Sequence, residues 1–172
     1  KMMEFRADFH IHSKYSADGA MTIDTIFERA LRKGLGAVAV ADHNVFHGSY
    51  EALSKERGDL MVIPGVEVST SKGHMLCYFV SKGPSDAGLV RRNGVYQFDE
   101  VRDFTEEEGG LIFAAHPFRK NVMRAADVLS QLTGIEVFNG RNTSRRQAAN
   151  NAARMLAASV LRREATPIWL PK

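Results

Sequence analysis

The sequence predicts an α/β fold with a barrel-like, mainly parallel sheet wrapped by helices, built as one domain over residues 1–172. Three observations support this prediction. Short apolar runs alternate with amphipathic stretches along the chain, as in sheets covered by helices. Histidines and carboxylates gather at the carboxyl ends of the expected strands, where parallel α/β folds place their sites. A length of 172 residues, 44% of them hydrophobic, suits one domain with a sizeable core.

The first half of the chain predicts four strands and two helices. The expected strands cover residues 4–11, 37–41, 60–68 and 74–80, and the expected helices cover 23–33 and 49–55. Thr22 is the predicted N-cap of the first helix, and Gly34 is predicted to end it. The segment 37–41 is wholly apolar, which indicates a strand buried on both faces.

The second half continues this alternation after a polar, glycine-containing loop at 81–94. The expected strands cover residues 111–115 and 135–138, and the expected helices cover 98–108, 125–132 and 144–163. The net charge is +3, and its excess lies in the last third of the chain, at Arg141, Arg145, Arg146, Arg154, Arg162 and Arg163. A solvated helix face is the simpler interpretation of these arginines, and contact with phosphate or nucleic acid is the alternative.

The composition argues against several classes of protein. No apolar run reaches the roughly 18 residues that a membrane span requires. The first residues lack the apolar segment and cleavage site of a secretory signal. The single cysteine, Cys77, leaves no partner for an intramolecular disulfide. We therefore expect a cytoplasmic protein without membrane contact.

Five of the six histidines are expected beside the ends of strands, and His47 is expected at the surface. His10 and His12 end the first strand. Because side chains alternate along a strand, these two imidazoles share one face with Asp8 and lie about 7 Å apart. Two imidazoles so placed can converge on one metal ion. Asp8 is then a candidate acceptor that orients one of the two rings.

The other candidate ligands come from separate segments. His43 and His116 follow the second and fifth strands, His74 begins the fourth, Glu67 ends the third, and Asp18 lies in the first loop. Each residue alone is more often a hydrogen-bonded core histidine or a turn former. Together they are typical of a centre with several metal ions, because imidazole suits zinc, manganese or iron and a carboxylate can bridge two ions.

Six segments resemble the polymerase and histidinol phosphatase (PHP) family in order and spacing. They are Asp8–Ser13, Tyr15–Gly19, Ala41–Asn44, Pro64–Ser69, Gly73–Leu76 and Ala115–Pro117. The similarity runs from about Arg6 to Gly140, and residues Ile135–Gly140 are also similar to that family. The resemblance implies a distorted (β/α)7-type barrel of about seven strands.

The resemblance also implies two to three divalent ions, of zinc, manganese or iron, and a set of ligands for each. The implied ligands are His10, His12 and Glu67 for the first ion, Glu67, His74 and His116 for the second, and Asp18 and His43 for the third. Members of the family are mostly phosphoesterases of small phosphorylated molecules or nucleotides. Other members are nucleases or domains associated with polymerases. Nucleic acid is therefore a possible partner of this protein, but a small phosphorylated molecule is favoured.

The expected mechanism uses water activated by the ions, with no protein nucleophile. Glu67, His116 and Arg119 are the expected catalytic residues. Arg119 is a candidate phosphate clamp, because guanidinium binds phosphate through two parallel hydrogen bonds. Arg141 is a weaker candidate for that role. Cys77 lies within an apolar strand and is interpreted as a core residue.

The sequence departs from the family pattern near its C-terminal end. A final Asp-x-His element would complete the first and third ion sites, yet no Asp or His follows Asp127. The chain is a shortened or frame-shifted form, a natural short form with two ions, or one subunit of a site that a partner completes. We expect the first, with a barrel incomplete at the C-terminus whose exposed sheet edge favours a homo-oligomer.

These observations predict a metal-dependent phosphoesterase that hydrolyses phosphate esters of a small molecule or nucleotide. The same ligand types can activate water against a carbonyl, so an amide or C–N hydrolase is one alternative. The other is a metal-binding or interaction remnant that has lost catalysis with its final Asp-x-His ligands.

Overall fold

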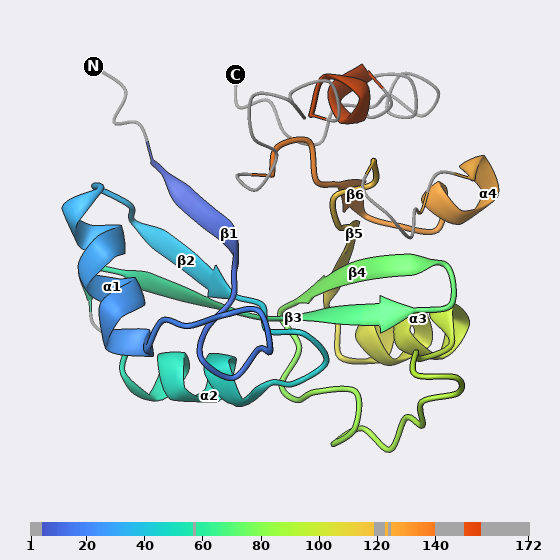
Figure 1. The fold of residues 1–172 in the computed structure, drawn as a ribbon, viewed down its shortest axis with the longest axis horizontal. Helices are drawn as coiled ribbons and strands as arrows, with labels where there is room; N and C mark the ends of the chain where they lie inside the picture. The colour runs from blue at the N-terminus through green and yellow to red at the C-terminus, as the bar shows by residue number, and fades with distance from the viewer. Residues whose placement is uncertain (1–4, 57, 119–122, 124, 140–149, 156–172) are drawn as a thin grey trace.

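The computed structural model describes residues 5–56, 58–118, 123, 125–139 and 150–155. Its strands are β1 (Ala7–Ile11), β2 (Ala37–Val40), β3 (Met61–Thr70), β4 (Gly73–Tyr78), β5 (Leu111–Ala114) and β6 (Gly134–Ile135). Its helices are α1 (Ile23–Arg32), α2 (His47–Ser54), α3 (Phe98–Glu107) and α4 (Ala126–Leu129). The six strands form one sheet in chain order. The sheet curls, so that its two edge strands, β1 and β6, rise on the same side (Figure 1).

The α/β class is confirmed, and the sheet is a curled half-barrel. Three strand pairs are parallel, β1–β2, β2–β3 and β5–β6, whereas β4 runs antiparallel to both of its neighbours. The expectation of a mainly parallel sheet is therefore wrong around β4. The cause is the short turn through Ser71 and Lys72, because a two-residue connection can join only antiparallel strands. A seventh strand does not occur among the residues that the structure describes.

The first predicted helix begins and ends where its caps indicate. The hydroxyl of Thr22 accepts a hydrogen bond from the backbone N–H of Thr25 at 3.2 Å, which satisfies one of the free donors of the first turn. Gly34 follows the helix with a φ of 67°, a conformation that glycine adopts without steric cost. Most of the predicted helix 144–163 lies outside the described residues. The part that the structure describes, residues 150–155, is helical.

The alternating side chains of β2 serve two different layers. Val38 and Val40 point to the core beneath α1 and α2, together with Ile26. Ala37 and Ala39 point to the opposite, inner face of the sheet. The strand is therefore buried on both faces, as predicted.

A second core forms beneath the other half of the sheet. Val101 and Phe104 of α3 pack there with Val66 and Val68 of β3. Cys77 of β4 belongs to this core with no exposed surface, and burial raises the pKa of its thiol to about 12. The interpretation of this cysteine as a core residue is confirmed, since a buried thiol that stays protonated is a poor nucleophile.

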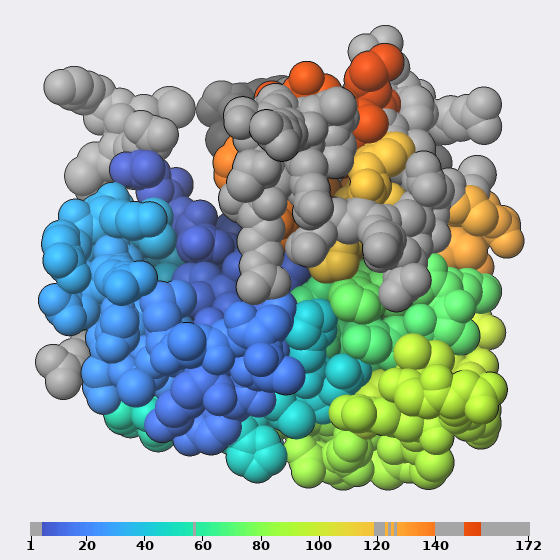
Figure 2. Space-filling model, in the orientation of Figure 1, coloured from blue at the N-terminus to red at the C-terminus, as the bar shows by residue number. Residues whose placement is uncertain are grey.

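The two cores lie side by side along the sheet. In Figure 2 the segment from β1 to α1, in blue, occupies one side of the visible face, and the segment from β4 to α3, in green to yellow, occupies the other. Within the described part of the chain, no helix is both long and apolar enough to cross a membrane.

Candidate metal centre

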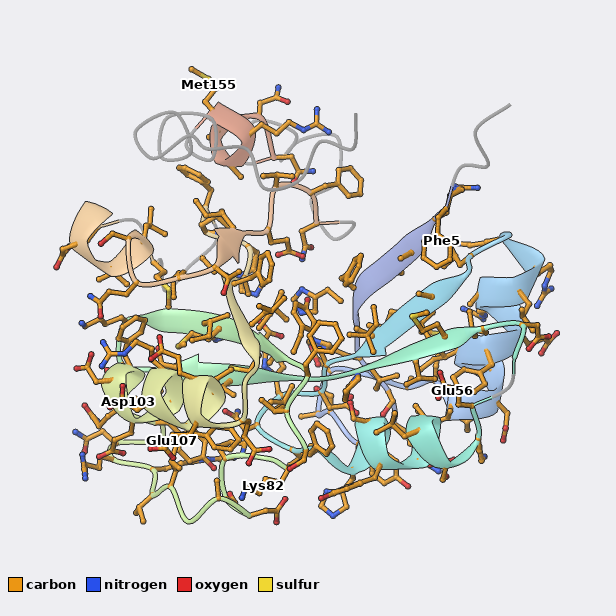
Figure 3. All side chains as sticks on the ribbon, turned by 180° about the vertical axis from the view of Figure 1, so that it is seen from behind. Phe5, Glu56, Lys82, Asp103, Glu107 and Met155 are labelled. Carbon is orange, nitrogen blue, oxygen red and sulfur yellow. The ribbon has the colours of Figure 1, made fainter. Side chains whose placement is uncertain are left out.

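A cleft of about 1830 Å³ opens on the inner face of the sheet. It lies between β1 and the segment that follows β6, and side chains crowd this space in Figure 3. All seven predicted ligands line it: His10, His12, Asp18, His43, Glu67, His74 and His116. The structure therefore brings together side chains from β1, β3, β4 and three connecting segments.

Glu67 of β3 is the centre of this cluster, and its side chain has no exposed surface. Its Oε2 lies 3.0 Å from Nε2 of His10 and 2.8 Å from Nε2 of His12. Its Oε1 lies 2.9 Å from Nδ1 of His74 and 2.8 Å from Nε2 of His116. Oε1 thus faces two imidazoles and Oε2 faces three, since Nδ1 of His43 also lies 3.4 Å from Oε2. A carboxylate surrounded in this way can bridge two ions.

The two histidines of β1 face the same carboxylate oxygen. Their Nε2 atoms are 3.1 Å apart, nearly the same distance as each nitrogen from Glu67 Oε2. Tetrahedral ligands around an ion at about 2.0 Å stand about 3.3 Å from one another. These three atoms therefore already have nearly the spacing that a shared ion requires, and the residues fit a divalent metal.

Asp18 extends the cluster away from Glu67. Its carboxylate Oδ1 is 2.7 Å from Nδ1 of His12, and its Oδ2 is 3.7 Å from Nε2 of His43. The hydroxyl of Ser16 donates to Asp18 Oδ1 at 2.8 Å and accepts the backbone N–H of His43 at 3.2 Å. Ser16 therefore holds the first loop against the segment after β2. One ligand atom from each of His12, Asp18 and His43 lies within 4.8 Å of the other two.

His43 is turned toward Glu67 by the backbone that surrounds it. The N–H of Asn44 donates to the carbonyl of Glu67 at 2.8 Å, and the N–H of Glu67 donates to the carbonyl of Asp42 at 3.2 Å. Asn44 has a φ of 61°, which turns the chain sharply after the histidine. The buried Nδ1 of His43 makes no hydrogen bond among the described residues and lies 3.4 Å from Glu67 Oε2, a position from which it can bind an ion.

His116 completes the cluster from the end of β5. Its φ of 29° is unusual for a residue with a side chain, and such strain persists only where the surroundings hold it. Its backbone N–H donates to Glu136 Oε2 at 2.5 Å, while its ring nitrogen Nε2 faces Glu67. The geometry of the turn at His116 thus depends on a glutamate of the next strand end.

The charges of the cluster also fit a metal centre. Burial would raise the pKa of Glu67, but hydrogen bonds from four histidines outweigh it and hold that pKa far below the usual value. Burial opposes the charged form of His10, but hydrogen bonds to Glu136 and Glu67 raise its pKa to about 10. Burial dominates at His43 and lowers its pKa. An ionised carboxylate in a ring of imidazoles can exchange the imidazole protons for metal ions.

Asp42 anchors the loop that carries Asp18. Its carboxylate is buried, and Oδ1 and Oδ2 accept the backbone N–H and the hydroxyl of Ser13, each at 2.6 Å. Burial raises the pKa of Asp42, and the two hydrogen bonds from Ser13 counter part of that rise. A Cβ atom at Gly48 would lie 1.9 Å from Asp42 Oδ2, so only glycine permits this close approach.

The variant Asp42→Ala is expected to lower the free energy of unfolding by about 3 kcal/mol, because it leaves the buried N–H and hydroxyl of Ser13 without acceptors. Asp42→Asn should lose about 1 kcal/mol, since the amide oxygen still accepts one bond. Asp103→Ala, at an exposed ion pair on α3, is the control. Urea unfolding measures all three, and a loss at Asp42→Ala no larger than the control's would contradict the expectation.

The sequence analysis did not predict Glu136, and it assigned to Asp8 the role of orienting a histidine ring. Asp8 was the candidate acceptor for a histidine ring, but its Oδ1 accepts the backbone N–H of His10 at 3.2 Å. Glu136 holds the ring instead, with Oε1 at 2.9 Å from His10 Nδ1. The resemblance of Ile135–Gly140 to the family was the signal that pointed to this segment. Arg119 and Arg141 lie outside the described residues, and His47 is exposed and stacks on Tyr15 at 5.8 Å.

The chain is similar in sequence to known proteins. An uncharacterized protein of Methanocaldococcus jannaschii is 32% identical over 148 residues, which cover 78% of this chain and 81% of that protein. A 3′,5′-nucleoside bisphosphate phosphatase of Chromobacterium violaceum is 32% identical over 96 residues, which cover 55% of this chain and 33% of the phosphatase.

Solved structures share the fold. An amidohydrolase from Chromobacterium violaceum superposes with a TM-score of 0.71 at 18% identity, covering 90% of this chain and 83% of that one. A Bifidobacterium adolescentis protein, whose proposed activity is that of a metal-dependent phosphoesterase, superposes with a TM-score of 0.67 at 19% identity, covering 93% and 85%. The family profile of the PHP domain matches residues 8–153, most of the chain. The chain therefore belongs to the PHP domain family.

Proposed function

We propose that this protein is a metal-dependent phosphoesterase that hydrolyses phosphate esters of a small molecule or nucleotide. The observation that carries the proposal is the cluster around Glu67, in which one buried carboxylate faces four histidine nitrogens at 2.8–3.0 Å. The chemistry that bound divalent ions supply is activation of water near neutral pH and neutralisation of phosphoryl oxygens. We propose two to three such ions, of zinc, manganese or iron.

The side chains of the cluster would hold the ions in three groups. Atoms within 4.8 Å of one another form the sets His10, His12 and Glu67; His12, Asp18 and His43; and His43, Glu67 and His74. His116 would bind beside His74, since both rings face Glu67 Oε1. Glu67 remains ionised, so it contributes the negative charge that offsets the cations as substrate binds.

The wall of the cleft supports a substrate with an aromatic or other apolar part. Phe9 and Phe138 line the same cleft as the histidines and are 50% and 58% exposed, and the ring of Phe9 packs edge-on against Tyr78 at 6.0 Å. A nucleotide base can stack on such a ring, and stacking contributes about 1–3 kcal/mol per base. One relative is a 3′,5′-nucleoside bisphosphate phosphatase, and its similarity to this chain supports a nucleotide-like substrate here.

Hydrolysis of an aryl phosphate and of a matched aryl amide, each with zinc, manganese or iron added, tests the proposal. We expect turnover of the phosphate that disappears with a chelator and returns with metal. Turnover of the amide alone would favour the amide hydrolase reading. Bound metal with turnover of neither substrate would favour a metal-binding protein that has lost catalysis, and would contradict the proposal.

A further inference from the structure

We infer that Glu136 is a positioning residue of the metal centre, whose carboxylate joins the two open edges of the sheet and fixes the His10 ring. This role rests on the proposed metal centre but on no particular substrate. Glu136 follows β6, and His10 lies in β1. The two strands are the opposite edges of the sheet, with four strands between them.

Four contacts carry the inference. Glu136 Oε1 accepts from Nδ1 of His10 at 2.9 Å and from the side-chain amide of Asn139 at 3.0 Å. Glu136 Oε2 accepts the backbone N–H of His116 at 2.5 Å, and the backbone N–H of Glu136 donates to the carbonyl of Ala114 at 2.9 Å. The carboxylate thus bonds two histidines of the ligand cluster, His10 and His116, and the backbone N–H ties the same residue to β5.

The bond to His10 decides which ring nitrogen faces the cluster. With its proton on Nδ1 and donated to Glu136, the ring turns Nε2 toward Glu67 Oε2 at 3.0 Å. A carboxylate in this position fixes the ring orientation and raises the basicity of the ligating nitrogen. The side chains of His10 and Glu136 are each only 10% exposed, so little water competes for the bond.

The open side of the sheet makes this contact more important than it would be within a closed one. β1 pairs with β2 and β6 pairs with β5, and among the residues that the structure describes β1 does not pair with β6. Tyr78 links β4 to β1 by donating to the carbonyl of Phe9 at 2.6 Å. The contact of Glu136 with His10 ties the end of β6 to β1, and so holds the ligands of β1 and of the β5 end in register.

The test is the affinity of the purified chain for zinc alone, measured by calorimetric titration without substrate. Glu136→Ala is expected to bind zinc about 10- to 100-fold more weakly. Glu136→Gln should lose less, because its one carbonyl oxygen still accepts from His10 Nδ1. In the zinc-loaded wild type, NMR should detect a slowly exchanging His10 Nδ1–H, which Glu136→Ala should lose.

Glu56→Ala is the matched control, because Glu56 also accepts a backbone N–H, from Val62 at 2.8 Å, and lies beside α1 and α2 (Figure 3). Its zinc affinity should equal that of the wild type. Wild-type affinity in Glu136→Ala would overturn the inference. An equal loss in both variants would overturn it too, because the effect would then be general destabilisation. Zinc binding without phosphate hydrolysis would contradict the proposed function but would not contradict the role of Glu136.

Discussion

Replacing Glu67 with glutamine is expected to lower kcat/KM for an aryl phosphate about 1000-fold, equivalent to about 4 kcal/mol of transition-state stabilisation. Its Oε1 faces two histidine nitrogens and its Oε2 faces three. Glutamine offers one acceptor oxygen and no charge, and its amide group would point donors at two imidazoles. We therefore also expect at least one fewer metal ion per chain, measured by elemental analysis.

Glu108→Gln is the matched control for this substitution. Glu108 also accepts bonds from its surroundings, with Oε2 at 3.0 Å from the backbone N–H of Ser81, but it does not line the cleft. The control should keep wild-type activity and metal content. If Glu67→Gln kept both as well, Glu67 would not bridge ions in this protein, and the proposed arrangement of ligands would be wrong.

The parts of the fold that the sequence predicted well depend on local chemistry. The N-cap at Thr22 and the two-sided burial of β2 both follow from a few neighbouring residues. The convergence of His10 and His12 follows from the two-residue period of a strand. Each of these features is determined by the residue types within one element, so a sequence pattern suffices to predict it.

The features that the sequence missed depend on distant partners. Glu136 meets His10 across 126 positions of the chain, after a strand of only two residues, so no local periodicity marks it. Asp8 is two positions from His10 and was the nearer candidate, but a short side chain so close in sequence bonds the local backbone. The short turn before β4 implies an antiparallel strand. The alternation of strands and helices along the chain favours a parallel sheet instead, and that pattern led to the wrong orientation for β4.

Removal of the metal is expected to make stability depend strongly on pH. The buried cluster raises the pKa of His10 from its usual 6.5 to about 10, through hydrogen bonds and charge interactions with Glu136 and Glu67 that outweigh burial. The folded chain therefore binds a proton more tightly than the unfolded chain. This stabilisation is fully present below pH 6.5 and is lost as the pH rises through about 10.

Urea unfolding of chelated protein between pH 6.5 and 10 should therefore show a falling free energy of unfolding, by an amount on the order of a few kcal/mol. Zinc-loaded protein should show a weaker dependence, because bound cations replace the protons that balance Glu67. His10→Gln should flatten the curve of the chelated protein, whereas His47→Gln, at an exposed ring beside Tyr15, should not. Greater stability of the chelated wild type at high pH would mean that the imidazoles do not carry the charge that balances the buried carboxylate.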